Sequence, residues 1–110
     1  MEEILNPLWT IINSHAFQKM HEWNENGEFI YDARVAIEVI REQMSLFREK
    51  TKDLPGLSYN ISLILHATNR IDEMIKGSMT YNKMDLSIFY HSIEHTINGM
   101  ISDPEYWNIK

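Results

Sequence analysis

Residues 33–47, ARVAIEVIREQMSLF, contain the pattern that decides the fold. Apolar side chains recur there at spacings of four and three residues: Ala33, Ile37, Ile40, Met44 and Phe47. An α-helix turns once every 3.6 residues, so these side chains share one face of a helix. Arg48, Lys50 and Lys52 follow the pattern, where cations suit the negative end of the helix dipole. The stretch predicts a long amphipathic helix over about residues 29–52.

Three further segments repeat this alternation of spacings. The predicted helices cover about residues 6–24, 58–76 and 82–102. Asn6 and Pro7 are expected to open the first of them, because proline has no N–H to leave unpaired in a first turn. Ser58 and Asn82 are the predicted N-caps of the other two. Gly77 is a predicted C-cap, since glycine readily adopts the left-handed conformation that ends helices.

The apolar stripes of these helices form the predicted core. In the first helix the stripe is Leu5, Leu8, Ile12, Ala16, Met20 and Trp23. In the other two helices the stripes are Ile61, Ile64, Thr68, Ile71 and Ile75, and Leu86, Phe89, Ile93, Ile97 and Met100. Loops of about three to six residues place sequence neighbours side by side. We therefore expect one all-α domain over residues 1–110, an antiparallel four-helix bundle with a short aromatic C-terminal tail.

The charge of the chain narrows the classes of partner. Its 110 residues include 16 acidic and 10 basic side chains, for a formal net charge of -6. This charge repels nucleic-acid backbones and anionic membranes, so we expect no direct contact with either. The absence of cysteine excludes a disulfide scaffold and thiolate metal sites. The N-terminal residues lack the pattern of a signal peptide, which predicts a cytoplasmic location. The abundance of Ile and Asn, whose codons are AT-rich, favours a low-GC source such as some bacteria and their phages.

Two helices carry apolar side chains on a second face, opposite the core stripe. On helix 29–52 these residues are Val35, Val39 and Leu46. On helix 82–102 they are Met84 and Ile88, in line with His91 and His95. A helix that is apolar on two sides is either enclosed on both or pressed against another chain. Both interpretations stay open, and these seven residues form the predicted partner-binding site, either for another protein or for a second copy.

The segment His91-Ser92-Ile93-Glu94-His95 matches H-x-x-E-H, a pattern in which two histidines one turn apart bind zinc. The spacing suits a metal ion, since side chains at i and i+4 share a helix face. However, Ile93 belongs to the core stripe, which turns His91 and His95 outward, and a third ligand is not evident. We expect histidines of a helix surface or an interface, with no resident metal and no cofactor.

Clustered carboxylates offer the main enzymatic alternative, because all-helical hydrolases hold Mg²⁺ with acidic residues on facing helices. The candidates are Glu38, Glu42, Asp72 and Glu73. Arginines repeat every seven residues along one flank of helix 29–52, at Arg34, Arg41 and Arg48. Arginine at such positions usually pairs with an acidic residue on the next helix, and Asp72 is one candidate. Ion pairing is therefore the competing interpretation of these charges.

The leading functional hypothesis is a small acidic protein-interaction module that regulates or inhibits a larger protein, as phage-encoded inhibitors and bacterial immunity proteins do. It rests on small size, the lack of catalytic signatures and the second apolar faces. Net acidity would steer the chain toward a basic partner, such as a nucleic-acid-processing enzyme. The alternatives are a Mg²⁺-dependent hydrolase and a structural or assembly subunit. We expect a protein without enzymatic activity.

Overall fold

The computed structural model describes residues 2–20, 29–77 and 83–102, and every regular element in these ranges is helical. The elements are α1 (Glu2–Ile12), α2 (His15–Lys19), α3 (Phe29–Lys50), the short 3-10 helix η2 (Pro55–Leu57), α4 (Ser58–Ile75) and α5 (Lys83–Ser102). The prediction of an all-helical chain is thus confirmed over the described ranges. The predicted aromatic tail and Trp23 lie outside them.

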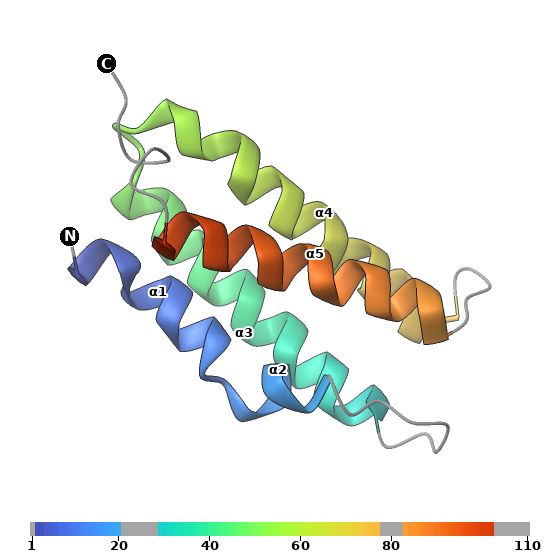
Figure 1. Cartoon of the computed structure of the whole chain (residues 1–110). Helices are drawn as coiled ribbons and strands as arrows, with labels where there is room; N and C mark the ends of the chain where they lie inside the picture. Colours follow the sequence, from blue (N-terminus) through green and yellow to red (C-terminus); the bar gives the residue numbers. More distant parts are fainter. Residues whose placement is uncertain (1, 21–28, 78–82, 103–110) are drawn as a thin grey trace.

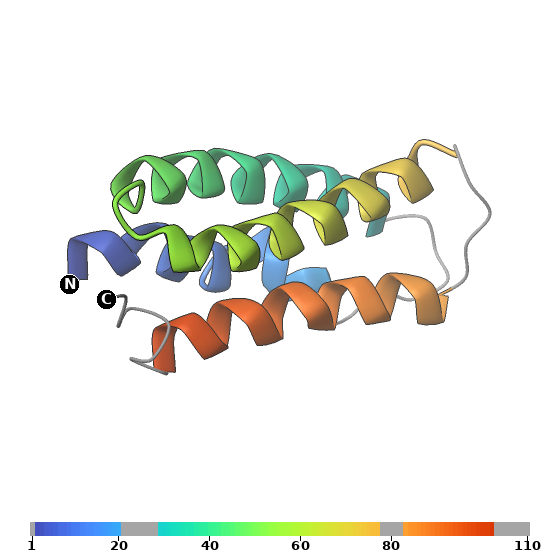
Figure 2. The ribbon, with the colours of Figure 1, turned by 90° about the horizontal axis from the view of Figure 1, so that it is seen from above.

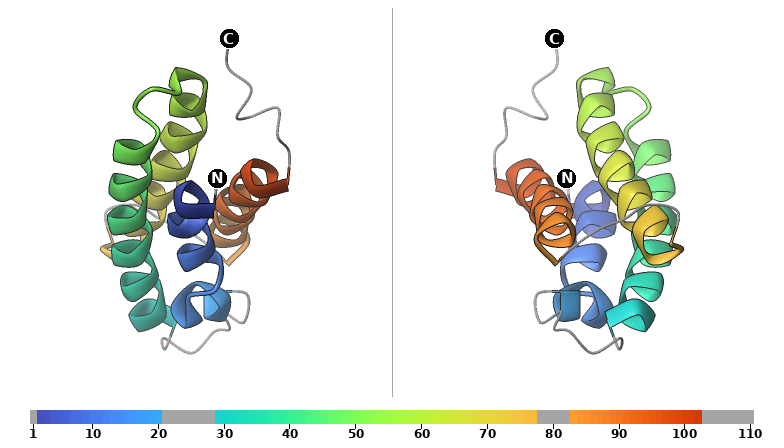
Figure 3. Two further views of the ribbon diagram at one scale, coloured as in Figure 1. Left: turned by 90° about the vertical axis from the view of Figure 1, so that its left-hand side faces the viewer. Right: turned by 90° about the vertical axis from the view of Figure 1, so that its right-hand side faces the viewer.

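The long helices α1, α3, α4 and α5 lie side by side, and each runs opposite to the one before it (Figure 1). α3 packs against α1, α2 and α4, whereas α5 packs against α4 and α1. Figures 2 and 3 show α3 and α5 on opposite sides of the molecule. This arrangement is compatible with a four-helix bundle in which α1 and α2 together take the place of the first helix.

The prediction of one helix over residues 6–24 is wrong. The chain breaks after α1, where the Ser14 N–H bonds the carbonyl of Ile11 (3.1 Å) and the Ser14 backbone is extended (φ -63°, ψ 129°). The Ser14 hydroxyl then accepts a hydrogen bond from the N–H of Phe17 (3.4 Å), which makes Ser14 the N-cap of α2. The core face of α1 includes Ile11, while Ile12 is only half-buried, and the break gives α2 a helical phase of its own, in which Phe17 is buried.

The start of α1 also differs from the expectation at Asn6 and Pro7. The helix begins at Glu2, and Pro7 lies inside it. Proline there lacks the N–H that would bond the carbonyl four residues earlier, a loss that a helix tolerates best near its N-terminus. The side chain of Pro7 is buried, so its ring contributes to the core. Asn6 and Pro7 therefore have the sequence pattern of a helix start, although the helix begins earlier in the chain.

Helices α3, α4 and α5 confirm the predicted elements to within two residues at each end. Every side chain of their predicted stripes is buried except that of Phe89, which is half-buried. The predicted N-cap at Ser58 is wrong: η2 leads directly into α4, Leu57 is the N-cap, and Ser58 is the first helical residue. Gly77 follows the C-cap of α4 with φ 78°, and its N–H bonds the carbonyl of Met74 (3.1 Å), so the predicted glycine end is confirmed. Asn82 lies outside the described residues.

Candidate interaction surface

The outward side of α5 is an exposed helix face with almost no charge. We define the α5 face by its exposed side chains: Ser87, Ile88, His91, Ser92, His95, Asn98 and Ser102. At 100° per residue these positions fall within less than half of the helix circumference. Between Leu86 and Ser102 the sequence contains no Asp, Lys or Arg and one Glu, Glu94, whose side chain is partly buried. Ile88 is 57% exposed, more than any other large aliphatic side chain of the described residues.

The opposite side of α5 fixes the helix to the core. Ile93 and Tyr90 are buried at 0% and 2% exposure. The ring of Tyr90 packs against Phe17 of α2 with centroids 4.8 Å apart, so aromatic packing joins α2 to α5. Tyr90 was not part of the predicted core stripe, yet it belongs to the core. Tyr90 stands four residues after Leu86 and three before Ile93, so the helical spacing carried the signal for its burial.

Glu94 connects this buried contact to the α5 face. The Tyr90 hydroxyl donates a hydrogen bond to Glu94 Oε2 (3.2 Å), and Glu94 Oε1 lies 3.7 Å from Nδ1 of His91. The ring of His91 meets that of Tyr90 edge-on, with centroids 5.4 Å apart. Burial raises the pKa of Tyr90 above its ordinary value of 10.0, and the neighbouring Glu94 carboxylate raises it further. Tyr90 therefore keeps its proton and remains a hydrogen-bond donor to Glu94.

The predicted site residues divide between two separate surfaces. Ile88, His91 and His95 are exposed together on α5, while Met84 lies in the first turn of that helix with its side chain outside the described part. Val35 and Val39 of α3 are half-buried and packed against the core. Of the three predicted site residues on α3, Leu46 is the exposed one, at 47%. The structure thus brings together three of the seven residues as an open surface.

The candidate carboxylates are not gathered into a metal site. Within the described residues, no group of three or more His, Cys, Asp or Glu side chains could hold a metal ion. Asp72 of α4 instead accepts a hydrogen bond from Arg41 of α3 (3.1 Å) and pairs with Lys76 (3.0 Å). Glu73 pairs with Arg70 (3.2 Å). The predicted pairing of an α3 arginine with Asp72 is confirmed.

Arg41 joins α3 to α4 through two acceptors. Its Nη2 atom also donates to Oδ1 of Asn69, at 2.8 Å. Partial burial acts to raise the pKa of Asp72, but hydrogen bonds and charge attraction from Lys76 and Arg41 outweigh it, so the pKa is lowered below 3.8. Asp72 is therefore an ionised structural partner between two helices at neutral pH.

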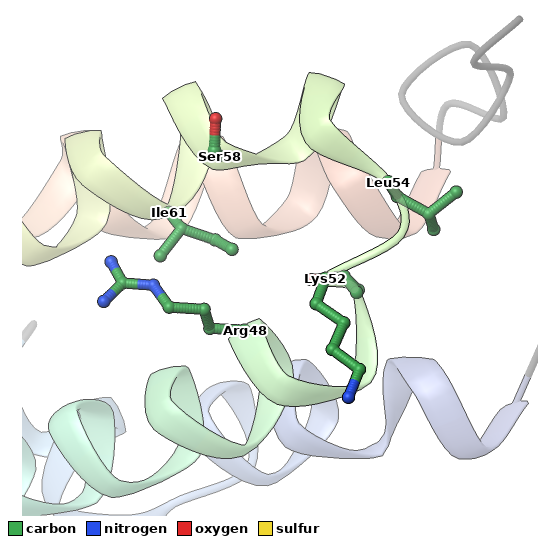
Figure 4. A pocket seen from close by; sticks show the side chains of 6 residues that line it. Arg48, Lys52, Leu54, Ser58 and Ile61 are labelled. Carbon is green, nitrogen blue, oxygen red and sulfur yellow. The ribbon is translucent and has the colours of Figure 1, made fainter.

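A pocket of about 280 Å³ lies where α3 turns into α4 (Figure 4). Its walls are formed by Arg48, Thr51, Lys52, Leu54, Ser58 and Ile61. Lys52 already pairs with Glu49 (3.3 Å), and the Thr51 hydroxyl donates to the carbonyl of Phe47 (2.7 Å). Arg48 and Lys52 are both exposed, so water and salt screen the attraction of their charges for an anion. The pocket is a weaker binding candidate than the α5 face.

Comparison of the chain with protein-family models, with curated proteins and with solved structures found no match. None of the helices in the described ranges combines the length and apolar character that a membrane span requires.

Proposed function

We propose that this chain is a small acidic protein-interaction module that regulates or inhibits a larger protein, and that the α5 face is its contact surface. Protein interfaces are depleted of charged side chains at their centre. The observation that carries the proposal is the exposed set on α5, in which Ile88 stands among serines, histidines and an asparagine with no carboxylate or cation. Covering such a face avoids the large desolvation cost of a carboxylate or an ammonium group, while its serine, histidine and asparagine side chains need hydrogen-bond partners across the contact.

The expected partner is a basic protein, such as a nucleic-acid-processing enzyme. The net charge of -6 raises the association rate with a positively charged target, while an uncharged contact face avoids the cost of burying unpaired charges. In this proposal, charges elsewhere on the chain guide the encounter and the α5 face makes the lasting contact. A second copy of the chain is the competing occupant of the same face.

The proposal includes a setting and a fold. The chain acts without catalysis in the cytoplasm of a bacterium or of a phage-infected cell, as an antiparallel four-helix bundle with α1 and α2 as one broken element. The opposite directions of successive helices support the bundle.

The test compares two exposed aliphatic residues. Tagged wild-type chain, Ile88→Asp and Leu46→Asp would be used to capture proteins from a lysate of the source organism, with mass spectrometry of what co-purifies. Leu46 is the matched control, since it is 47% exposed against 57% for Ile88 but lies on α3. We expect Ile88→Asp to lose the captured protein and Leu46→Asp to retain it. Equal capture by both variants would contradict a contact through α5.

Two controls accompany this comparison. Circular dichroism should show the same helical signal for both variants, because surface substitutions usually change stability by about 0.5 kcal/mol or less. Light scattering after gel filtration then distinguishes a partner protein from a second copy of the chain as the occupant of the α5 face. A wild-type dimer that Ile88→Asp converts to monomer would assign the face to a second copy in place of a basic partner.

A further inference from the structure

His91 and His95 stand one helical turn apart on the α5 face. Side chains at i and i+4 of a helix have Cβ atoms about 5–6 Å apart, which lets two imidazoles reach one ion. Both histidines are exposed, with 58% of the His91 side chain accessible to solvent. Ile93 between them is fully buried, which fixes the outward direction of the pair.

Glu94 supports the pair from the side of the core. Its Oε1 atom lies 3.7 Å from Nδ1 of His91, and its Oε2 atom accepts the hydrogen bond from buried Tyr90. At this distance the carboxylate attracts a proton on Nδ1 without forming a hydrogen bond, which favours the tautomer whose lone pair lies on Nε2. Histidines that bind metals usually have such a carboxylate or carbonyl partner behind them. The anchored Tyr90 and Glu94 therefore prepare His91 as a ligand.

We propose that His91 and His95 form a two-ligand chelate for a borderline divalent transition metal, Zn²⁺, Ni²⁺ or Cu²⁺, with Glu94 orienting His91. Imidazole suits these ions, whereas Mg²⁺ prefers oxygen ligands. The described residues supply no third protein ligand, so water completes the coordination and the ion exchanges more readily than in a four-ligand structural site. The expectation of no resident metal concerns an ion that stays bound, and this site binds reversibly.

The test is isothermal titration of the untagged chain with ZnCl2, NiCl2 and CuCl2, with MgCl2 as the negative control. We expect one ion per chain for the three transition metals. His91→Ala and His95→Ala should each reduce the affinity to that of a single histidine. His66→Ala is the matched control, because His66 is an exposed histidine of α4 outside the pair, and this variant should bind like the wild type. Glu94→Gln should weaken binding by about tenfold without abolishing it.

Histidine side-chain NMR signals provide a second readout during the ZnCl2 titration. The signals of His91 and His95 should shift together at the same metal concentration, while those of His15 and His66 stay in place. The proposal is overturned if either single-histidine variant binds as tightly as the wild type, or if His66 responds as strongly as the pair. Metal binding is measured on the chain alone, so this result is separate from the fate of the proposed protein contact.

Discussion

The outer faces of α3 and α5 lie on opposite sides of the molecule and differ in chemistry (Figures 2 and 3). The exposed side chains of α3 from residue 34 onward are mostly charged: Arg34, Glu38, Arg41, Glu42, Ser45, Leu46, Arg48, Glu49 and Lys50. Those of the α5 face include no Asp, Glu, Lys or Arg. Both helices have a regular buried stripe, so the difference lies in what each presents to water.

The charges of α3 serve its own fold. Arg41 donates to Asn69 and Asp72 of α4, so part of the charged face also fastens two helices together. Mixed charges of both signs keep such a face hydrated and discourage association. On the α5 face, His91 lies 3.7 Å from the carboxylate of partly buried Glu94. The outer face of α3 is therefore suited to contact with water, whereas the α5 face is suited to contact with another protein.

The largest expected effect tests the orientation of α5. Ile93→Ala removes a fully buried side chain and should lower the free energy of unfolding by about 2–5 kcal/mol. Ile88→Ala removes the same atoms from the exposed face and should change it by about 0.5 kcal/mol or less. Urea denaturation followed by circular dichroism measures both. Similar losses for the two variants would show that Ile88 is also core, and the uncharged face would then be misplaced.

The next effect concerns the hydrogen bond from Tyr90 to Glu94. Tyr90→Phe keeps the ring packed on Phe17 and deletes the hydroxyl, so the free energy of unfolding should fall by about 1 kcal/mol. The raised pKa of Tyr90 predicts a pH dependence as well. The unfolded chain ionises this phenol near pH 10.0 and the folded chain does not, so this contribution to stability is present below pH 10.0 and is lost as the pH rises above it.

Alkaline titration followed by phenolate absorbance measures that dependence. The folded wild type and the folded Tyr90→Phe variant should give the same phenolate signal just above pH 10.0, because Tyr90 contributes none there. A larger signal from the wild type in this range would show that Tyr90 is open to solvent. That result would show that the hydrogen bond from Tyr90 to Glu94 does not connect the core to the α5 face.

The smallest expected effect concerns the ion pair of Arg41, on the charged face of α3, with Asp72. Arg41→Ala should cost about 1 kcal/mol or less, because Arg41 is 43% exposed and exposed ion pairs contribute little. Asp72 has a lowered pKa, so its contribution is present above pH 3.8 and is lost as the pH falls below that value toward the lowered pKa. Unfolding curves of Asp72→Asn and the wild type should therefore converge in acid. A gap that stays constant as the pH falls would contradict the ionised pair.

The fold is predictable from the sequence wherever a helix has a regular apolar stripe. In α3 the spacing from Ala33 to Phe47 allows a single phase, and the structure buries that stripe. In the N-terminal segment, Ile11 and Ile12 are adjacent and so are Ala16 and Phe17, so two phases fit the apolar pattern equally well. The N-cap at Ser14 decides between them in the folded chain, and one serine in the sequence is too weak a signal to predict that helix start.

The candidate site was predictable where it depends on one helix alone. The exposure of Ile88, His91 and His95 follows from the burial of Ile93 and the helical repeat. Val35 and Val39 lie on a helix that contacts three other elements, so their partial burial depends on how α1, α2 and α4 surround α3. A single helix pattern contains no information about that enclosure. The link from Tyr90 to Phe17 likewise joins segments far apart in the sequence.

Photo-crosslinking tests the central claim most directly, because it records what touches each outer face inside the cell. The photoreactive residue p-benzoylphenylalanine would replace either Ser92 on the α5 face or Ser45 on the charged face of α3, two exposed serines in helices. After irradiation of cells of the source organism, we expect a discrete protein adduct from the Ser92 variant and none from the Ser45 variant. Adducts from Ser45 alone, or the same adducts from both positions, would contradict the assignment of the contact surface to α5.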